Sequence, residues 1–151
     1  MSNPTAWQLR AFEDLHLAEL HALLVARSEV FVVEQACAFQ DIDGTDPQAL
    51  HLMGWQAGGL VAYARCFPAG VKYAEASIGR VLTRQGVRGQ GLGHVLIEKA
   101  RDAIAQTWGE QAIRIGAQAR LVHFYAQHGY LDAGKPYVED GIDHLEMVWT
   151  P

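Results

Sequence analysis

The chain has 151 residues, of which 50% are hydrophobic and 19% are charged. A chain of this length can bury roughly two thirds of the surface that it exposes when unfolded, so we expect one domain spanning residues 1–151. The formal net charge of −5 argues against nucleic-acid binding, which requires a basic face. No apolar run approaches the roughly 20 residues that span a bilayer, and the first residues lack the pattern of a signal peptide. We therefore expect a cytoplasmic protein with no membrane partner.

In the first half of the chain, apolar periodicity and turn residues predict helices, strands and loops in a definite order. Asp14 is the expected N-cap of the helical region, which we expect to be interrupted near Arg27 and Ser28. A tight turn is expected at Ala57-Gly58-Gly59. The predicted segments are an edge strand, the helical region, an acidic loop and the two strands of a hairpin: 5–12, 15–34, 35–48, 50–56 and 60–67.

The second half alternates strands with helices. The expected segments are a strand, an amphipathic helix beginning at Leu92, a strand, a short helix with Gly129 at its end, an acidic loop and a last strand: 76–83, 92 onward, 112–118, 119–128, 139–144 and 145–149. The apolar face of the helix from Leu92 is expected to comprise Leu92, Val95, Leu96, Ala100, Ala103 and Ile104. Strands joined through a helix run parallel, so the expected fold class is α/β or α+β with one mixed, mostly antiparallel sheet.

The run from Arg88 to Gly93 places glycines at positions 89, 91 and 93, directly before and at the start of the predicted helix. Glycines let several backbone N–H groups converge on an anion, and the positive end of the helix macrodipole points at the same place. The spacing fits neither the dinucleotide fingerprint nor the Walker loop. The run therefore predicts a phosphate site, with a glycine-rich loop without a ligand as the alternative.

Arg88, Gly91 and Gly93 resemble the acetyl-CoA motif of the GNAT superfamily of N-acetyltransferases, and Tyr125 followed by Gly129-Tyr130 resembles the tyrosine-bearing helix of that family. The segments that narrow the resemblance to the ElaA-like branch are 31–37, 40–44, 78–81, 116–119 and 140–144. The resemblance implies the acyl-CoA N-acyltransferase fold, acetyl-CoA as cosubstrate and no metal. It also implies a primary amine, on a small molecule or a peptide, as acceptor.

The same resemblance implies a set of site residues. Tyr125 would protonate the leaving thiolate. The side chain of Gln118 would contact the pantetheine arm of the cosubstrate. The residues implied in acetyl-CoA binding are Val81, Leu82, Thr83, Arg88, Gly89, Gln90, Gly91, Leu92, Gly93, His94 and Gln118.

The general base is not assigned by the sequence. The candidates are Glu34, His51, His123 and His144, of which Glu34 and His144 come first because they lie in the two acidic segments. Direct loss of the proton to water is the alternative.

Arg80 is a charged residue within an apolar strand. Alternation places it on the face of Ile78 and Leu82, so we expect it to pair with a carboxylate such as Glu34 or Asp43.

The predicted function is transfer of the acetyl group of acetyl-CoA to an amine by direct attack. A non-catalytic module that binds or senses acyl-CoA is the alternative. The two acidic loops would either attract a cationic amine or be ordinary solvated loops. Trp55, Trp108 and Trp149 are candidates for the interface of a homodimer.

Overall fold

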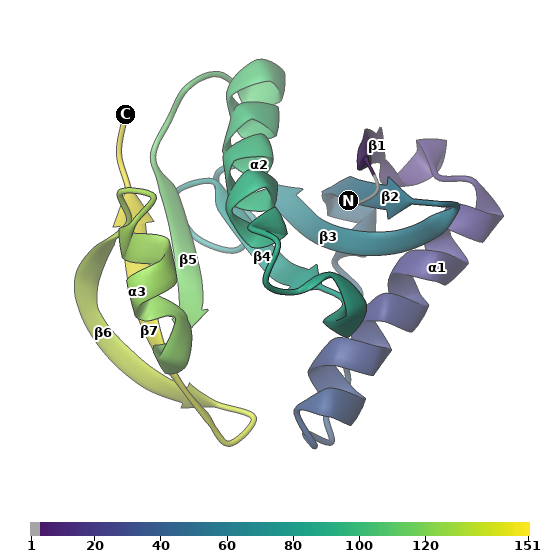
Figure 1. Cartoon of the computed structure of the whole chain (residues 1–151). Coiled ribbons are helices and arrows are strands. Elements are labelled where there is room, and N and C mark those ends of the chain that lie inside the picture. Colours follow the sequence, from purple (N-terminus) through teal and green to yellow (C-terminus); the bar gives the residue numbers. More distant parts are fainter. Residues whose placement is uncertain (1–3) are drawn as a thin grey trace.

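Two antiparallel sheets lie side by side in the computed structural model, which describes residues 4–151 (Figure 1). The first sheet has the order β1-β2-β3-β4, with bounds Ala6–Ala11, Leu50–Gln56, Gly59–Phe67 and Ser77–Thr83. The second has the order β5-β7-β6, with bounds Ile113–Gln118, Ile142–Trp149 and Leu131–Glu139. The α-helices are α1 (Leu17–Arg27), α2 (Leu92–Trp108) and α3 (Val122–Ala126). Within residues 4–151, no helix is long and apolar enough to cross a membrane.

The junction between the sheets lies at β4 and β5, the two strands that α2 connects. These strands meet in a parallel bridge between Ala76 and Ile113, where the Arg114 N–H donates to the Ala76 carbonyl over 2.8 Å. Beyond that bridge they diverge (Figure 1). The predicted parallel orientation of the two strands is confirmed, but the expectation of one continuous sheet is wrong. The divergence leaves an edge of β4 facing an edge of β5.

The N-terminal elements differ from the prediction mainly in their caps. The edge strand is confirmed as β1, whereas Asp14 lies in a short 3-10 turn and does not cap α1. The cap is His16, whose N–H donates to the Glu19 carboxylate over 2.8 Å in a capping box. The expected interruption after Arg27 is confirmed, because α1 passes there into a π-helical segment, Ser28–Glu34.

The C-terminal hairpin was not expected. Strand β6 was missed because it is mostly exposed and contains Pro136 and Gly134, which are untypical of strands. It lies at the edge of its sheet, where proline is tolerated, and its pairing with β7 shifts register between Asp132 and Pro136. The expected acidic loop is largely this hairpin. Only Asp140 and Gly141, with φ of 51° and 76°, form its turn.

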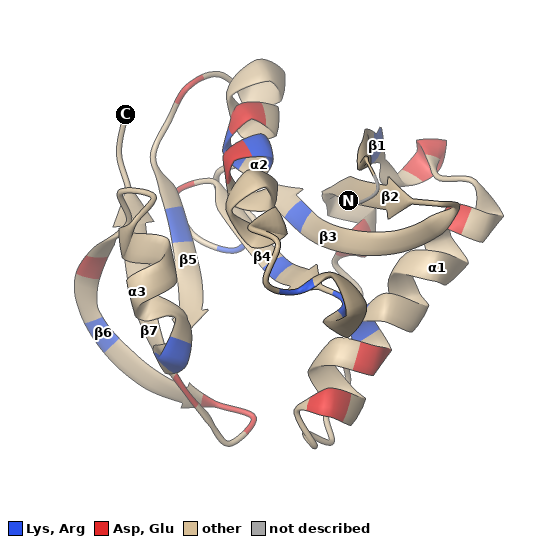
Figure 2. Ribbon diagram, in the orientation of Figure 1, with Lys and Arg blue, Asp and Glu red and all other residues tan. Residues whose placement is uncertain are grey.

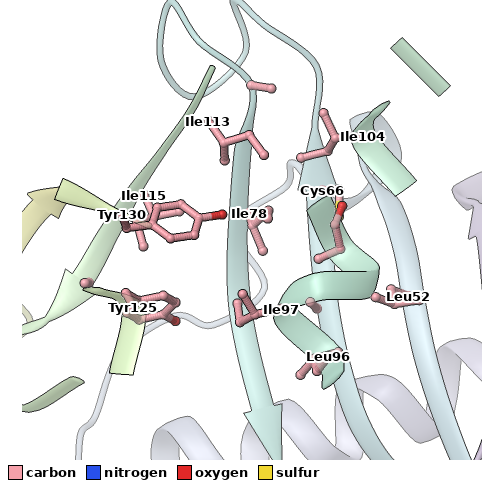
Figure 3. Packing of buried hydrophobic residues seen from close by; sticks show 14 of the residues in the cluster. Leu52, Cys66, Ile78, Leu96, Ile97, Ile104, Ile113, Ile115, Tyr125 and Tyr130 are labelled. Atoms are coloured by element: carbon pink, nitrogen blue, oxygen red, sulfur yellow. The ribbon is translucent and has the colours of Figure 1, made fainter. Parts of the chain in front are cut away.

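The main core lies between the first sheet, α2 and β5 (Figure 3). The face of α2 differs from the prediction at one turn: Ile97 is buried, while Val95 is 40% exposed. The predicted helix at 119–128 is shorter than expected, since the α-helical part spans only Val122–Ala126. From its end, Tyr125 packs edge-to-face against Tyr130, with ring centroids 5.8 Å apart. This places the Tyr125 ring where β4 and β5 separate.

Candidate active site

A cleft of about 1140 Å³ opens between the diverging strands. Its walls come from β4 and β5, from the π-helical segment with the loop that follows it, and from the β6–β7 hairpin. The predicted site residues that line it are Glu34, Val81, Leu82, Thr83, Arg88, Gln118, Tyr125 and His144. Residues predicted separately from the sequence are thus brought into one cavity large enough for a cofactor and a substrate.

A β-bulge shapes the β4 wall of the cleft. Arg80 has φ of 51°, and the pairing of β4 with β3 shifts register opposite this residue. The extra residue places Ile78 in the core beneath α2 and Leu82 in the core against α1. The prediction that Ile78, Arg80 and Leu82 share one face is therefore wrong. Because β4 is the last strand of its sheet, its backbone groups on the β5 side are available to a ligand.

The glycine run forms an open loop at the N-terminus of α2. Gly89 and Gly91 have φ of 89° and 75°, which other residues rarely adopt. A Cβ built at either position meets no atom within 4 Å, so the loop surface is open. Gly91 caps α2 without any side-chain hydrogen bond, leaving the first N–H groups of the helix free for an anion. These features fit the phosphate site that the sequence predicts at this loop.

The remaining loop residues lie outside the cleft lining. His94 faces α3, where its Nδ1 lies 2.8 Å from Nε2 of His128 and its ring contacts Phe124. Gln90, Leu92 and Gly93 belong with it to the loop and the first turn of α2. An anion bound at this loop would therefore meet their backbone N–H groups.

Tyr125 reaches the cleft from α3. The side chain is buried, and burial raises the pKa of Tyr125 to about 12. The phenol is therefore protonated at neutral pH and can donate a proton or a hydrogen bond into the cleft.

On the opposite wall, His144 of β7 stacks on Tyr137 of β6, with ring centroids 5.2 Å apart. The His144 Nδ1 lies 2.7 Å from the carbonyl oxygen of Ile142. A carbonyl only accepts, so Nδ1 carries the proton and Nε2 of the neutral ring keeps its lone pair. The Glu139 carboxylate lies 3.9 Å from Nε2. This arrangement can accept a proton and stabilise the resulting imidazolium.

The other candidate bases have different environments. Glu34 forms a two-pronged ion pair with Arg88, with distances of 2.7 and 3.3 Å. His51 is fully buried between the Tyr63 hydroxyl and the Asp46 carbonyl, so it stabilises the fold away from the cleft. His123 is exposed on α3 and does not line the cleft.

The acidic loop after the π-helical segment is held by arginines. The Arg27 side chain is fully buried, and Arg27, Arg65 and Arg80 together pair with the three aspartates Asp41, Asp43 and Asp46. Arg80 pairs with Asp43 over 3.7 Å, as expected. It also pairs with Asp41, which is closer at 2.8 Å. Because their charges are balanced, the aspartates stiffen the cleft wall and contribute little attraction for a cation.

Unpaired acidic charge lies instead on the β6–β7 hairpin. Within residues 4–151, no arginine or lysine pairs with Glu139, Asp140 or Asp143. Acidic residues colour both the hairpin and the π-helical segment that faces it across the opening (Figure 2). Of the two acidic loops predicted to attract a cationic amine, the hairpin is therefore the better placed.

Sequence reasoning missed several residues that line the cleft. Tyr73 and Tyr137 approach Gly116 with their hydroxyl groups, at the same end as His144. Gln35 accepts a hydrogen bond from Gln118 over 3.2 Å, and the Cys37 thiol lies 3.2 Å from the Asp140 carbonyl. These contacts join segments that are far apart in the chain, so no local sequence pattern predicts them.

The fold and the site together define an acyl-CoA N-acyltransferase: a splayed β4–β5 pair, an open glycine loop at a helix N-terminus, and a buried tyrosine at the cleft. The family model described as an acetyltransferase (GNAT) domain matches residues 17–151. The chain thus belongs to the GNAT family, within its ElaA-like branch.

Relatives cover almost the whole chain. A UPF0039 protein of Synechocystis is 39% identical, covering 95% of this chain and 94% of its own. Protein ElaA of Escherichia coli is 38% identical, covering 94% of each chain. The crystal structure of an acyl-CoA N-acyltransferase from Pseudomonas aeruginosa is 40% identical, covers 97% of this chain and 100% of its own, and superposes with a TM-score of 0.93. That of Escherichia coli ElaA is 36% identical, covers 97% and 99%, and superposes with a TM-score of 0.90. The predicted fold class, the acyl-CoA N-acyltransferase fold with mostly antiparallel strands flanked by helices, is confirmed, with two sheets in place of one.

Proposed function

We propose that this protein transfers the acetyl group of acetyl-CoA to a primary amine by direct attack. The observation that carries the proposal is the meeting, in one cleft, of a buried neutral phenol from α3 and an oriented imidazole from β7. Family membership supports acyl transfer to nitrogen. The choice of acetyl as the acyl group rests on the resemblance of the glycine run, Arg88 to Gly93, to the acetyl-CoA motif.

Acetyl-CoA supplies an acetyl group activated as a thioester. In the proposed site, the phosphates lie against the N–H groups of residues 89–94, with the Arg88 side chain nearby. The pantetheine arm follows the open edge of Val81, Leu82 and Thr83 and reaches Gln118. These assignments use backbone groups at the glycine loop and on the β5 side of β4, where the Thr83 carbonyl accepts a hydrogen bond from the Arg88 side chain.

Two side chains of the protein, His144 and Tyr125, would then each transfer one proton. His144 takes a proton from the acceptor nitrogen as the N–C bond to the acetyl group forms. Tyr125 gives its phenolic proton to the sulfur as the C–S bond breaks. The two side chains reach the cleft from different elements, so each proton is handled at its own position. Transfer of the amine proton to water is the alternative to His144.

The test is Tyr125→Phe, with acetyl transfer followed by thiol release against a panel of amines. We expect kcat to fall about 100-fold, the lower end of the usual effect of a general acid. Binding of acetyl-CoA, measured by calorimetry, should stay within about twofold, because the phenol interacts mainly as charge develops on sulfur. Tyr130→Phe is the matched control, since this neighbouring buried tyrosine does not line the cleft.

Equal kcat in wild type and Tyr125→Phe would contradict the role of Tyr125. His144→Ala should lower kcat in the same assay, and added imidazole should restore part of it if His144 is the base. Tight binding of acetyl-CoA by wild type without turnover of any amine would favour the non-catalytic binding or sensing module instead.

A further inference from the structure

Two residues assigned to different halves of the reaction bind each other. Arg88, from the loop expected to hold pyrophosphate, pairs with Glu34, the last residue of the π-helical segment. The guanidinium meets both carboxylate oxygens, at 2.7 and 3.3 Å, which is the geometry that makes arginine–carboxylate pairs strong. Both side chains line the cleft. The pair therefore spans the cleft between the cosubstrate loop and the wall that faces the hairpin.

Arg88 makes a third contact, with the backbone of β4. Its Nε donates to the Thr83 carbonyl oxygen over 3.0 Å. Thr83 belongs to the edge of β4 that is proposed to receive the pantetheine arm, so the Arg88 side chain occupies one of the backbone acceptors of the cosubstrate site. A phosphate group and the Glu34 carboxylate are also competing anions for one guanidinium.

Glu34 is connected to the far wall through its neighbours in sequence. The adjacent Gln35 bonds to Gln118 of β5, and Cys37 contacts the carbonyl of Asp140 in the hairpin turn. π-Helical turns of this kind are frequent at functional sites. A change at Glu34 is thus positioned to affect the side of the cleft where the acceptor nitrogen must approach His144.

We propose that Glu34 competes with the phosphates of acetyl-CoA for the Arg88 guanidinium, and that bound acetyl-CoA thereby frees Glu34 to bind a cationic group of the acceptor other than the nitrogen that attacks the thioester. This inference rests on the proposed function and goes beyond it. It assigns to Glu34 the recognition of a cationic group of the acceptor, in place of the role of general base.

The first test is binding of coenzyme A by isothermal titration calorimetry, which needs no turnover. Glu34→Gln keeps the shape of the side chain and removes its charge. We expect coenzyme A to bind about two- to fivefold more tightly to this variant, the range that a partly exposed ion pair contributes. Glu29→Gln is the matched control, because Glu29 lies on the same segment and pairs with Arg84 over 2.7 Å outside the cleft lining. The control should bind like wild type.

A double-mutant cycle separates competition from a general change of charge. In the Arg88→Gln background, Glu34→Gln should no longer change the affinity for coenzyme A, because no guanidinium is left to release. An equal gain in both backgrounds would mean that Glu34 simply repels phosphate, and would overturn the proposal. Unchanged or weaker binding by the single variant Glu34→Gln would overturn it as well.

The second test concerns the acceptor. It uses steady-state kinetics with a productive amine that carries a second cationic group. Glu34→Gln should raise KM for the amine severalfold and leave kcat within about twofold, whereas loss of a general base would lower kcat. A fall in kcat at unchanged KM would overturn the proposal. Failure of these tests with normal turnover leaves the proposed function standing; absence of coenzyme A binding by wild type overturns both.

Discussion

Replacing Arg27 by methionine tests the view that buried ion pairs hold the acidic loop in place. The Arg27 side chain is 0% exposed and lies 2.9 Å from Asp41 and 2.7 Å from Asp46, whose side chains are each 7% exposed. Methionine keeps most of the volume but leaves two buried carboxylates without this partner. Removing one member of a buried pair costs about 3–5 kcal/mol. Asp41 keeps Arg80 and Asp46 keeps Arg65, so we expect the low end, about 3 kcal/mol.

The assay is urea denaturation at pH 7 with linear extrapolation to water. A loss of about 3 kcal/mol corresponds to a fall of about 6–12 °C in Tm for a chain of this size. Arg10→Met is the matched control, because the Arg10–Glu19 pair is partly exposed and should contribute less than about 1 kcal/mol. A loss below about 1 kcal/mol for Arg27→Met would refute the reasoning, since the network would then stabilise the loop no more than surface pairs do.

The remaining predictions also concern stability. Burial opposes ionisation of Asp43 and Asp46, but hydrogen bonds and charge from the arginines outweigh it and hold the pKa of each below the ordinary aspartate value of 3.8. Their stabilisation is thus complete above that value and lost as the pH falls below it, so acid titration monitored by circular dichroism should show unfolding below about pH 4; equal stability at pH 3 and pH 7 would contradict this. Gly116→Ala places a Cβ against the Tyr137 hydroxyl and should cost about 1–3 kcal/mol in urea denaturation, whereas an unchanged midpoint would mean that the tyrosine moves freely. Tyr130→Phe removes a buried hydroxyl that has no hydrogen-bond partner in residues 4–151, so Tm should stay level or rise, and a clear drop would reveal an unseen partner.

Much of the proposed acetyl-CoA site was predictable because its residues are close together in the sequence. The strand before the glycine run, the run itself and the helix after it are contiguous, and each has its own pattern: apolar residues, glycines at positive φ, and helical spacing. The spacing of Tyr125 to Gly129 and Tyr130 identified this tyrosine as a further candidate site residue. Several of the predicted residues line the cleft, among them Val81, Thr83 and Tyr125, whereas residues 89–94 of the glycine loop lie outside that lining.

The errors have a common physical origin in long-range pairing. Strand β6 has weak strand propensity and is held by its partner β7 and by its edge position. The bulge at Arg80 depends on the register against β3, which no local pattern reveals. Reading strict alternation through Arg80 therefore placed Leu82 on the wrong face.

By itself the sequence determined the order of elements except β6, the family and the acetyl-CoA motif, because propensity, turn chemistry and glycine conformation act over a few residues. Only the tertiary structure decided which carboxylates are paired with arginine side chains and which are not. Asp41, Asp43 and Asp46 look like a solvated acidic loop in the sequence, yet arginines from α1, β3 and β4 neutralise them. Glu34 looks like a base and is bound to Arg88, 54 residues away in the chain. Charge pairing depends on distance in space, which only the folded chain sets.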